Sequence, residues 1–126
     1  MKYEVSLPIA GFDEVTTVEL VKDGTEVATL RSPEDEVLFF KVISSKAFEH
    51  INFSIPSSIK TILDIDENSE IEIYFNITIT NPIEKSIINI NSPLIFNNSN
   101  GKMAQFALEN ESVGVVVLSN FSAEEE

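Results

Sequence analysis

The sequence predicts an all-β protein, a small antiparallel β-barrel or sandwich with one or two short helices. Three observations support this fold class. Several short segments alternate apolar and polar residues, turn-forming residues separate them at intervals of roughly 8–12 residues, and only one stretch has clear helical spacing. A chain of 126 residues with 43% hydrophobic residues is large enough to bury a single core.

The N-terminal half contains four predicted strands. Three of them alternate with period two: residues 3–7, 18–20 and 27–30. Asp23–Gly24, between the second and third, predicts a hairpin turn, because Asp and Gly tolerate the positive φ of a two-residue turn. The fourth, residues 38–43, is an almost continuous apolar run, which favours a buried strand.

Residues 71–80 form the clearest strand, because β-branched residues dominate it and the alternation is regular. One face is expected to point into the core and carries Ile71, Ile73, Phe75, Ile77 and Ile79. The other face is expected to point outward and carries Glu72, Tyr74, Asn76, Thr78 and Thr80. The sequence therefore predicts one buried and one exposed face.

The C-terminal part completes the predicted strands with residues 87–90, a hairpin over 89–108, and residues 113–118. Asn100–Gly101 has the residues of a two-residue type I′ turn, in which both central positions need φ > 0. Pro93 has no backbone N–H, so the strand is expected to lie at an edge or to bend there.

Helical spacing occurs at Ile59, Ile62 and Leu63, and Ser57 or Ser58 is expected to cap this short helix. Residues 44–50 are expected to hold another helical turn. Residues 122–126 form an acidic tail that is expected to be disordered. We therefore predict a single β domain over residues 1–121.

Composition excludes several functional classes. The chain has no cysteine, which excludes disulfides and Cys-based zinc sites, and it has no apolar run of the ~20 residues that a membrane-spanning helix needs. The start has no apolar signal segment, so we expect a cytoplasmic protein. The formal net charge of −13 disfavours direct binding to nucleic acids or anionic membranes and permits a basic protein partner.

Motifs for chemistry are weak. His50 is the sole histidine, and no nucleophile is placed near it. Residues from Asp64 onward begin like an EF-hand loop, but Ser69 stands where glycine is needed and Phe75 where a bidentate Glu belongs. We therefore expect no metal, no cofactor and no enzymatic activity.

One alternative is a small β-barrel enzyme or a carbohydrate-binding module. Either would need a concave face with clustered aromatic side chains or paired carboxylates. Most phenylalanines fall in the apolar phase of the predicted strands, so core packing explains them more simply. A deep, polar, carboxylate-lined pocket would favour this alternative.

Several motifs in their order along the chain resemble the FliW family of flagellar assembly factors. PIAGFDE at residues 8–14 is similar to the family's P-x-x-G-F-E/D-E opening. FKVI within residues 39–43, INFSI at 51–55, and LDI with EIEI between residues 63 and 73 resemble strands of that family. The most similar stretch is NINSPLIFN at residues 89–97 with GKMAQFAL at 101–108. Ser44–Ser45 stands where the family has D-P, and residues 21–33 match poorly.

The resemblance implies a protein-binding regulator. FliW-family proteins bind flagellin in the cytoplasm and also bind CsrA, a small basic RNA-binding dimer that represses flagellin synthesis. Sequestering CsrA relieves that repression. An acidic protein that binds a basic one fits the net charge of this chain, and the free protein is expected to be monomeric.

The predicted partner-binding residues combine carboxylates with one aromatic side chain on or near the expected outward face of residues 71–80. They are Asp66, Glu67, Glu70, Glu72, Tyr74 and Glu84. An ordinary solvated face would look the same in sequence. The turn chemistry and the resemblance mark a second set as structural: Gly11, Phe12, Pro93, Asn97, Asn100, Gly101 and Gln105.

Overall fold

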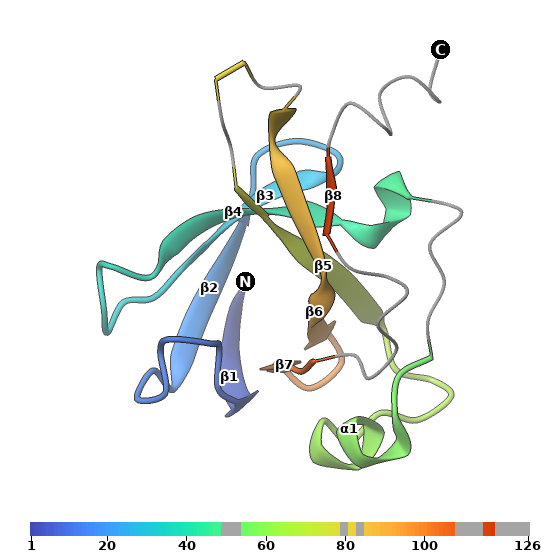
Figure 1. The fold of residues 1–126 in the computed structure, drawn as a ribbon. Helices are drawn as coiled ribbons and strands as arrows, with labels where there is room; N and C mark the ends of the chain where they lie inside the picture. Colours follow the sequence, from blue (N-terminus) through green and yellow to red (C-terminus); the bar gives the residue numbers. More distant parts are fainter. Residues whose placement is uncertain (49–53, 79–80, 83–84, 108–114, 118–126) are drawn as a thin grey trace.

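The computed structural model describes residues 1–48, 54–78, 81–82, 85–107 and 115–117, and the statements below concern these residues. Strands dominate the chain (Figure 1). They are β1 (Lys2–Leu7), β2 (Thr17–Lys22), β3 (Val27–Arg31), β4 (Phe39–Ser44), β5 (Ile71–Thr78), β6 (Ile87–Asn97), β7 (Lys102–Gln105) and β8 (Val115–Val117). The helical elements are the 3₁₀ turn η1 (Ser45–Ala47) and the helix α1 (Ser57–Ile62).

The strands close into a barrel in the order β5-β4-β3-β2-β1-β7-β6, and β6 returns to pair with β5. Every pair of neighbours is antiparallel except β1 and β7, which run parallel. β8 pairs with the first part of β6, beyond the end of β7. The predicted all-β fold class is therefore confirmed, with one parallel pair that the sequence did not predict.

The barrel interior holds the main apolar core. Its buried members come from all seven strands of the barrel and include Val18, Leu20, Leu30, Val42, Leu94, Phe96 and Met103. Two further clusters lie outside the barrel wall. Ile59 and Leu63 of the α1 region pack on Ile95 and Ala104, and Phe48 after η1 packs with Phe75. Parts of β5 and β6 are therefore buried on both faces.

The predicted orientation of β5 is wrong. Tyr74, expected to point outward, is only 2% exposed and packs with Tyr3 and Phe96 inside the barrel. Glu72 shares that face, because it pairs with Phe96 as Tyr74 pairs with Leu94. The isoleucine face lies outside the barrel wall, where the α1 and η1 regions cover it. A covered barrel strand buries both faces, so alternation does not tell the interior from the exterior.

Both hairpins are confirmed, but their turns are longer than predicted. Asn97 pairs with Lys102, which leaves a four-residue loop in which only Gly101 has positive φ (76°). The N–H of Gly101 donates to the Asn97 carbonyl at 2.9 Å. In the other hairpin Lys22 pairs with Ala28, and Gly24 does not have positive φ. Neither turn is of type I′.

Pro93 lies where β6 changes register. Tyr74 pairs with Leu94, but Asn76 pairs with Asn89, so residues 90–93 of β6 form a bulge against β5. Beyond this point β6 exchanges its second neighbour, β8, for β7. The predicted bend at Pro93 is confirmed.

The short helix is confirmed with a different N-cap. Pro56 occupies the N-cap position and makes no side-chain capping bond, so the predicted Ser57 or Ser58 cap is wrong. At the other end Asp64 has φ 52° and the N–H of Ile65 donates to the Lys60 carbonyl at 2.8 Å. These features form a Schellman-type C-terminus with Asp in the position that glycine usually takes.

The residues predicted to be structural make contacts that join separate segments. Asn97 and Asn100 both donate to the Leu63 carbonyl at 2.9 Å, which ties the β6–β7 loop to the end of α1. Gln105 accepts from the Ala10 N–H at 2.8 Å. Gly11, with φ 88°, sits in the turn between Ile9 and Phe12. No helix within the described residues is long and apolar enough to cross a membrane.

Candidate functional site at the mouth of the barrel

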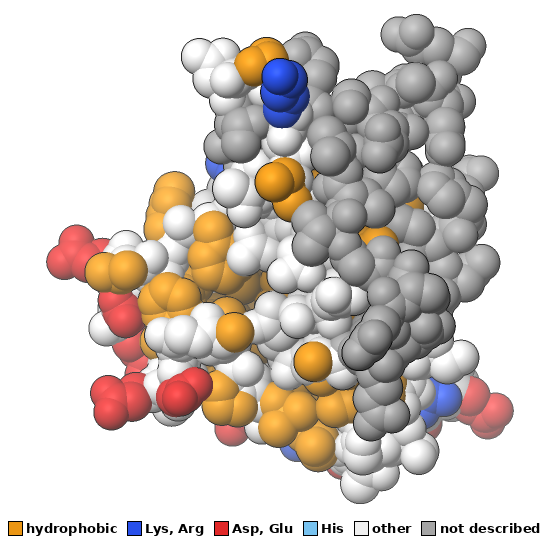
Figure 2. Space-filling view, viewed as in Figure 1, with side chains coloured by type: hydrophobic (Ala, Val, Ile, Leu, Met, Phe, Trp, Pro, Cys, Tyr) orange, Lys and Arg blue, Asp and Glu red, His pale blue; other side chains and the backbone are white. Residues whose placement is uncertain are grey.

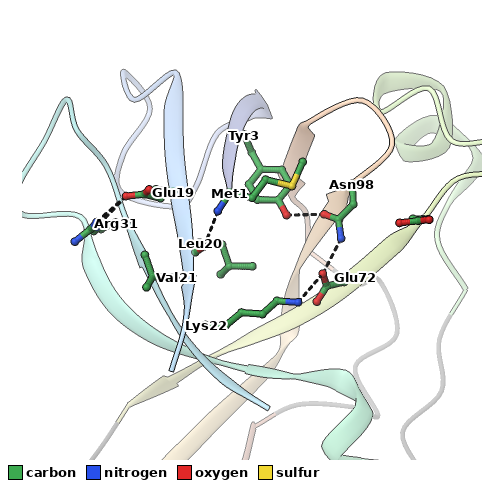
Figure 3. A pocket seen from close by; sticks show the side chains of 10 residues that line it. Met1, Tyr3, Glu19, Leu20, Val21, Lys22, Arg31, Glu72 and Asn98 are labelled. Atoms are coloured by element: carbon green, nitrogen blue, oxygen red, sulfur yellow. Dashed lines mark hydrogen bonds and ion pairs between the residues drawn. The ribbon is translucent and has the colours of Figure 1, made fainter. Parts of the chain in front are cut away.

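A cavity of about 670 Å³ opens at the end of the barrel where β2 ends and β5 begins (Figure 3). It combines an apolar wall with charged side chains of both signs. Its lining residues are Met1, Tyr3, Glu19, Leu20, Val21, Lys22, Arg31, Glu70, Glu72 and Asn98. The β6–β7 loop therefore meets the N-terminal hairpin here, although the two are far apart in sequence.

Glu72 is the centre of a polar network in this mouth (Figure 3). Its Oε1 accepts from Asn98 Nδ2 at 2.6 Å and from Lys22 Nζ at 3.1 Å. The Tyr74 hydroxyl donates to its Oε2 at 2.9 Å. The Tyr3 hydroxyl in turn donates to Asn98 Oδ1. One carboxylate thus links β2, β5 and the β6–β7 loop, and Asn98 extends the link to β1.

The network perturbs the acidity of its members. Burial raises the pKa of the Glu72 carboxyl, but the hydrogen bonds from Asn98, Tyr74 and Lys22 outweigh it and leave that pKa lowered. Burial, and next the nearby Glu72 charge, raise the pKa of Tyr3 to about 12. Burial, and next the hydrogen bond that its hydroxyl donates to Glu72, raise the pKa of Tyr74. At neutral pH the mouth therefore holds an ionised Glu72 and two neutral tyrosines.

A second group of lining residues comes from the face of β2 that is opposite to Leu20 and Lys22. Glu19 and Arg31 pair across β2 and β3, with 2.8 Å between Arg31 Nη2 and Glu19 Oε1. The amino group of Met1 donates to the Leu20 carbonyl at 3.1 Å and fixes the N-terminus beside the cavity. The side chains of Met1 and Leu20 supply the apolar part of the cavity lining (Figure 3).

The structure brings two predicted partner-binding residues into this one cavity, Glu70 and Glu72. Glu70 is exposed, and its backbone is fixed by Ser99 Oγ, which accepts from its N–H at 2.8 Å. Asp66 and Glu67 are exposed on the preceding loop, where Asp66 Oδ1 accepts from the Asn68 N–H at 2.8 Å. Glu84 and His50 lie outside the described residues.

Sequence reasoning missed the residues that complete the mouth: Met1, Tyr3, Lys22 and Asn98. The chain has only two tyrosines, and each lies within a segment that the sequence predicts as a strand. A buried tyrosine hydroxyl needs a polar partner, which was the available signal. The barrel closure that supplies the partner is not visible in the sequence.

The cavity does not favour the enzymatic alternative. Arg31 beside Glu19 lowers the pKa of that carboxyl, and Glu72 also has a lowered pKa. Two of the three lining carboxyls are therefore held ionised, whereas a general acid needs a raised pKa. Among the described residues no group of three or more acidic or His side chains is arranged to hold a metal ion.

Comparison with known proteins gives consistent matches. The family model described as FliW protein matches residues 2–117. A protein of Sulfurimonas denitrificans named flagellar assembly factor FliW is 37% identical over 116 residues, covering 91% of this chain and 92% of that protein. Flagellar assembly factor FliW 1 of Wolinella succinogenes is 32% identical, covering 86% of this chain and 84% of that protein. A crystal structure of the flagellar assembly factor FliW superimposes with a TM-score of 0.85 at 20% identity, over 93% of this chain and 84% of that one.

Proposed function

The chain belongs to the FliW family of flagellar assembly factors. We propose that it acts in the cytoplasm as a non-enzymatic, protein-binding regulator that binds flagellin and sequesters the translational repressor CsrA. Occupation by one partner then governs how much of the other is free. The observation that supports this proposal most directly is family membership over nearly the whole chain, from residue 2 to residue 117.

The charge of the molecule supports a basic partner. A net charge of −13 steers a basic protein inward and repels RNA, so binding would compete with the RNA contacts of such a partner. Glu70 lines the barrel mouth, and Glu67 is exposed on the loop that leads into β5. Among the described contacts neither side chain has an ion-pair partner, so both remain available to a Lys or Arg from outside.

The structure changes which residues should test this proposal. Glu72 is braced by three internal hydrogen bonds, so reversing its charge would damage the fold as well as any interface. Glu67→Lys with Glu70→Lys changes only exposed side chains. The matched control is Asp13→Lys with Glu14→Lys, which makes the same change in net charge on the exposed loop after β1, at the other end of the barrel.

Binding of purified CsrA and flagellin should be measured by isothermal titration calorimetry, with circular dichroism to verify folding. We expect Glu67→Lys with Glu70→Lys to weaken CsrA binding by at least about tenfold, and the control pair by much less. Equal effects of the two pairs would mean that the net charge of the protein, and not the surface around Glu67 and Glu70, attracts CsrA. Failure of the wild-type protein to bind either partner would refute the proposed function.

A further inference from the structure

The β6–β7 loop contains the only Asn–Gly pair in the sequence, Asn100–Gly101. Asparagine followed by glycine is prone to spontaneous deamidation, because a residue without a Cβ lets its backbone nitrogen approach the preceding side chain closely. Asn100 is exposed and Gly101 is half-buried, so water reaches this pair. The loop therefore combines a reactive dipeptide with access to the water that the reaction consumes.

Deamidation of this pair needs no reactant other than water. The Gly101 backbone nitrogen gives up its proton to a solvent base and bonds to Asn100 Cγ, while the Cγ–Nδ2 bond breaks and the side-chain nitrogen leaves as ammonia. Water then opens the cyclic imide at either carbonyl and yields aspartate or isoaspartate. One amide and one water thus become one carboxylate and one ammonium ion, with no change in oxidation state.

The folded loop holds the reacting groups in an arrangement that opposes this reaction. The N–H of Gly101 donates to the Asn97 carbonyl at 2.9 Å, so the attacking nitrogen is directed at another oxygen. Asn100 Oδ1 accepts from the Lys102 N–H at 3.0 Å, and Asn100 Nδ2 donates to the Leu63 carbonyl at 2.9 Å. Turning Cγ toward the Gly101 nitrogen breaks these hydrogen bonds, so the fold should slow the reaction.

The end of α1 fixes the loop in this arrangement. The last carbonyls of a helix have no partner within the helix. The Leu63 carbonyl, just after α1, is bound by Asn97 Nδ2 at 2.9 Å as well as by Asn100. Lys102 Nζ lies 2.7 Å from Asp64 Oδ2. Separation of α1 from the loop removes these contacts together and frees the Asn100 side chain.

α1 is attached to the barrel by apolar contacts. Ile59 is 6% exposed, and it packs with Leu63 on Ile95 and Ala104. Hydrophobic side chains gather near the lower edge of the molecule in Figure 2, in the part of the view where Figure 1 places α1. A helix of six residues is too short to be stable when detached. We therefore expect the α1 region to open at a lower free energy than the whole barrel.

The products of deamidation cannot restore the contact with α1. Aspartate or isoaspartate at position 100 has a carboxylate in place of the amide, so it has no N–H to donate to the Leu63 carbonyl. The new negative charge also faces a carbonyl oxygen at the C-terminus of a helix, where negative charge is unfavourable. Isoaspartate further lengthens the main chain of the loop by one carbon.

We propose that Asn100 is a modification site at which the docked α1 region suppresses deamidation, and that the modified chain holds α1 less firmly. Opening of α1 exposes Asn100 to the reaction, and the product makes later opening more frequent. The extent of modification then records how long the protein has spent with α1 detached. This inference concerns the chain itself and does not rest on the partners in the proposed function.

The first test follows deamidation at Asn100 by peptide mass spectrometry at mildly alkaline pH. We expect the native protein to react at least about tenfold more slowly than the protein unfolded in urea. Ile59→Ala should loosen α1 and raise the native rate by at least about fivefold. The matched control is Ile77→Ala, the same truncation at an 8% exposed residue packed in the cluster of Phe48 and Phe75. It should change the rate by less than about twofold, and circular dichroism verifies that both variants fold.

The second test asks whether the product loosens α1. The N–H of Ile65 donates to the Lys60 carbonyl at the end of α1, so its hydrogen exchange, followed by NMR, reports opening there. We expect Asn100→Asp to speed this exchange by at least about fivefold, and Asn68→Asp by less than about twofold. Asn68→Asp makes the same change in charge on an exposed residue of the α1–β5 loop. Wild-type protein deamidated during incubation gives the same readout for the isoaspartate product.

Three results would overturn control of the reaction by α1: deamidation as fast in the native protein as in urea, no reaction at Asn100 in urea, or equal acceleration by Ile59→Ala and Ile77→Ala. Exchange at Ile65 that is the same in the wild type, in Asn100→Asp and in the deamidated protein would show that the product does not loosen α1, and the proposal would then be wrong.

Discussion

Replacing Glu72 by Ala should destabilise the fold because this carboxylate braces the barrel mouth. The substitution leaves Tyr74, Asn98 and Lys22 without their shared acceptor. Hydrogen bonds to a charged group are worth about 1.5–3 kcal/mol each when shielded. Lys22 is 57% exposed, so its share is about 0–1 kcal/mol. Because water can replace some of the bonds, we expect a loss of about 2–4 kcal/mol in the free energy of unfolding.

The loss should be visible in thermal and urea denaturation followed by circular dichroism at neutral pH. For a domain of this size, 1 kcal/mol shifts Tm by roughly 3–6 °C, so Glu72→Ala should lower Tm by about 10 °C. The matched control is Glu70→Ala, two residues away and exposed, which should stay within about 0.5 kcal/mol of the wild type. A decrease no larger than that of the control would refute the role of the network.

The same substitution should remove part of the acid sensitivity. The pKa of Glu72 is lowered in the folded state, since hydrogen bonds outweigh burial. Its contribution is therefore complete above the unfolded-state value of 4.5 and is lost as the pH falls through the folded-state value. The stability difference between wild type and Glu72→Ala should shrink in acid. A difference that is constant from neutral pH into acid would contradict the argument, because it would mean that packing and not the ionised carboxylate causes it.

Two further substitutions test other contacts. Tyr3→Phe removes the hydroxyl that bonds Asn98 and should cost about 1 kcal/mol at neutral pH. Since the pKa of Tyr3 is raised to about 12, the wild type should also lose stability as the pH rises from 10 toward 12, and urea titrations in which both proteins respond alike to alkali would contradict this. Asp64→Gly should be more stable than Asp64→Ala by about 1 kcal/mol, because both lose the pair with Lys102 but only glycine accepts φ 52° freely. Equal urea midpoints would show that this backbone conformation relaxes.

The strands were predictable from sequence because a period of two survives whatever the strand packs against. β5 and the hairpin around Asn100 illustrate this, since both occur where expected over the described residues; residues 79–80 of the predicted strand lie outside these. Which face of β5 points inward was not predictable. Its isoleucines could pack on any apolar surface. They lie outside the barrel because Ile59 and Phe48, from the α1 and η1 regions, cover them there. The turn lengths depended on register, which distant pairing sets.

The candidate site was predictable only in part for a related reason. The sequence predicts Glu70 and Glu72 as one exposed pair at one strand end, yet Glu70 is exposed and Glu72 is half-buried in the structure. The partners of Glu72 come from β2 and from the β6–β7 loop, and they meet it only because β1 pairs in parallel with β7 and closes the barrel. No local pattern near Glu72 encodes that closure.

This difference separates two roles that one acidic motif can play. A carboxylate such as Glu70, exposed and without an ion pair among the described residues, acts on partners through a field that accelerates their approach and that salt weakens. A carboxylate such as Glu72 accepts hydrogen bonds from donors within the protein. These neighbours screen its charge, so its main effect is on folding stability. Glu19 and Asp23 resemble Glu72 in this respect, because Glu19 pairs with Arg31 and Asp23 pairs with Lys41. On a protein with a net charge of −13, partner selectivity then depends on where carboxylates are left unpaired rather than on how many there are.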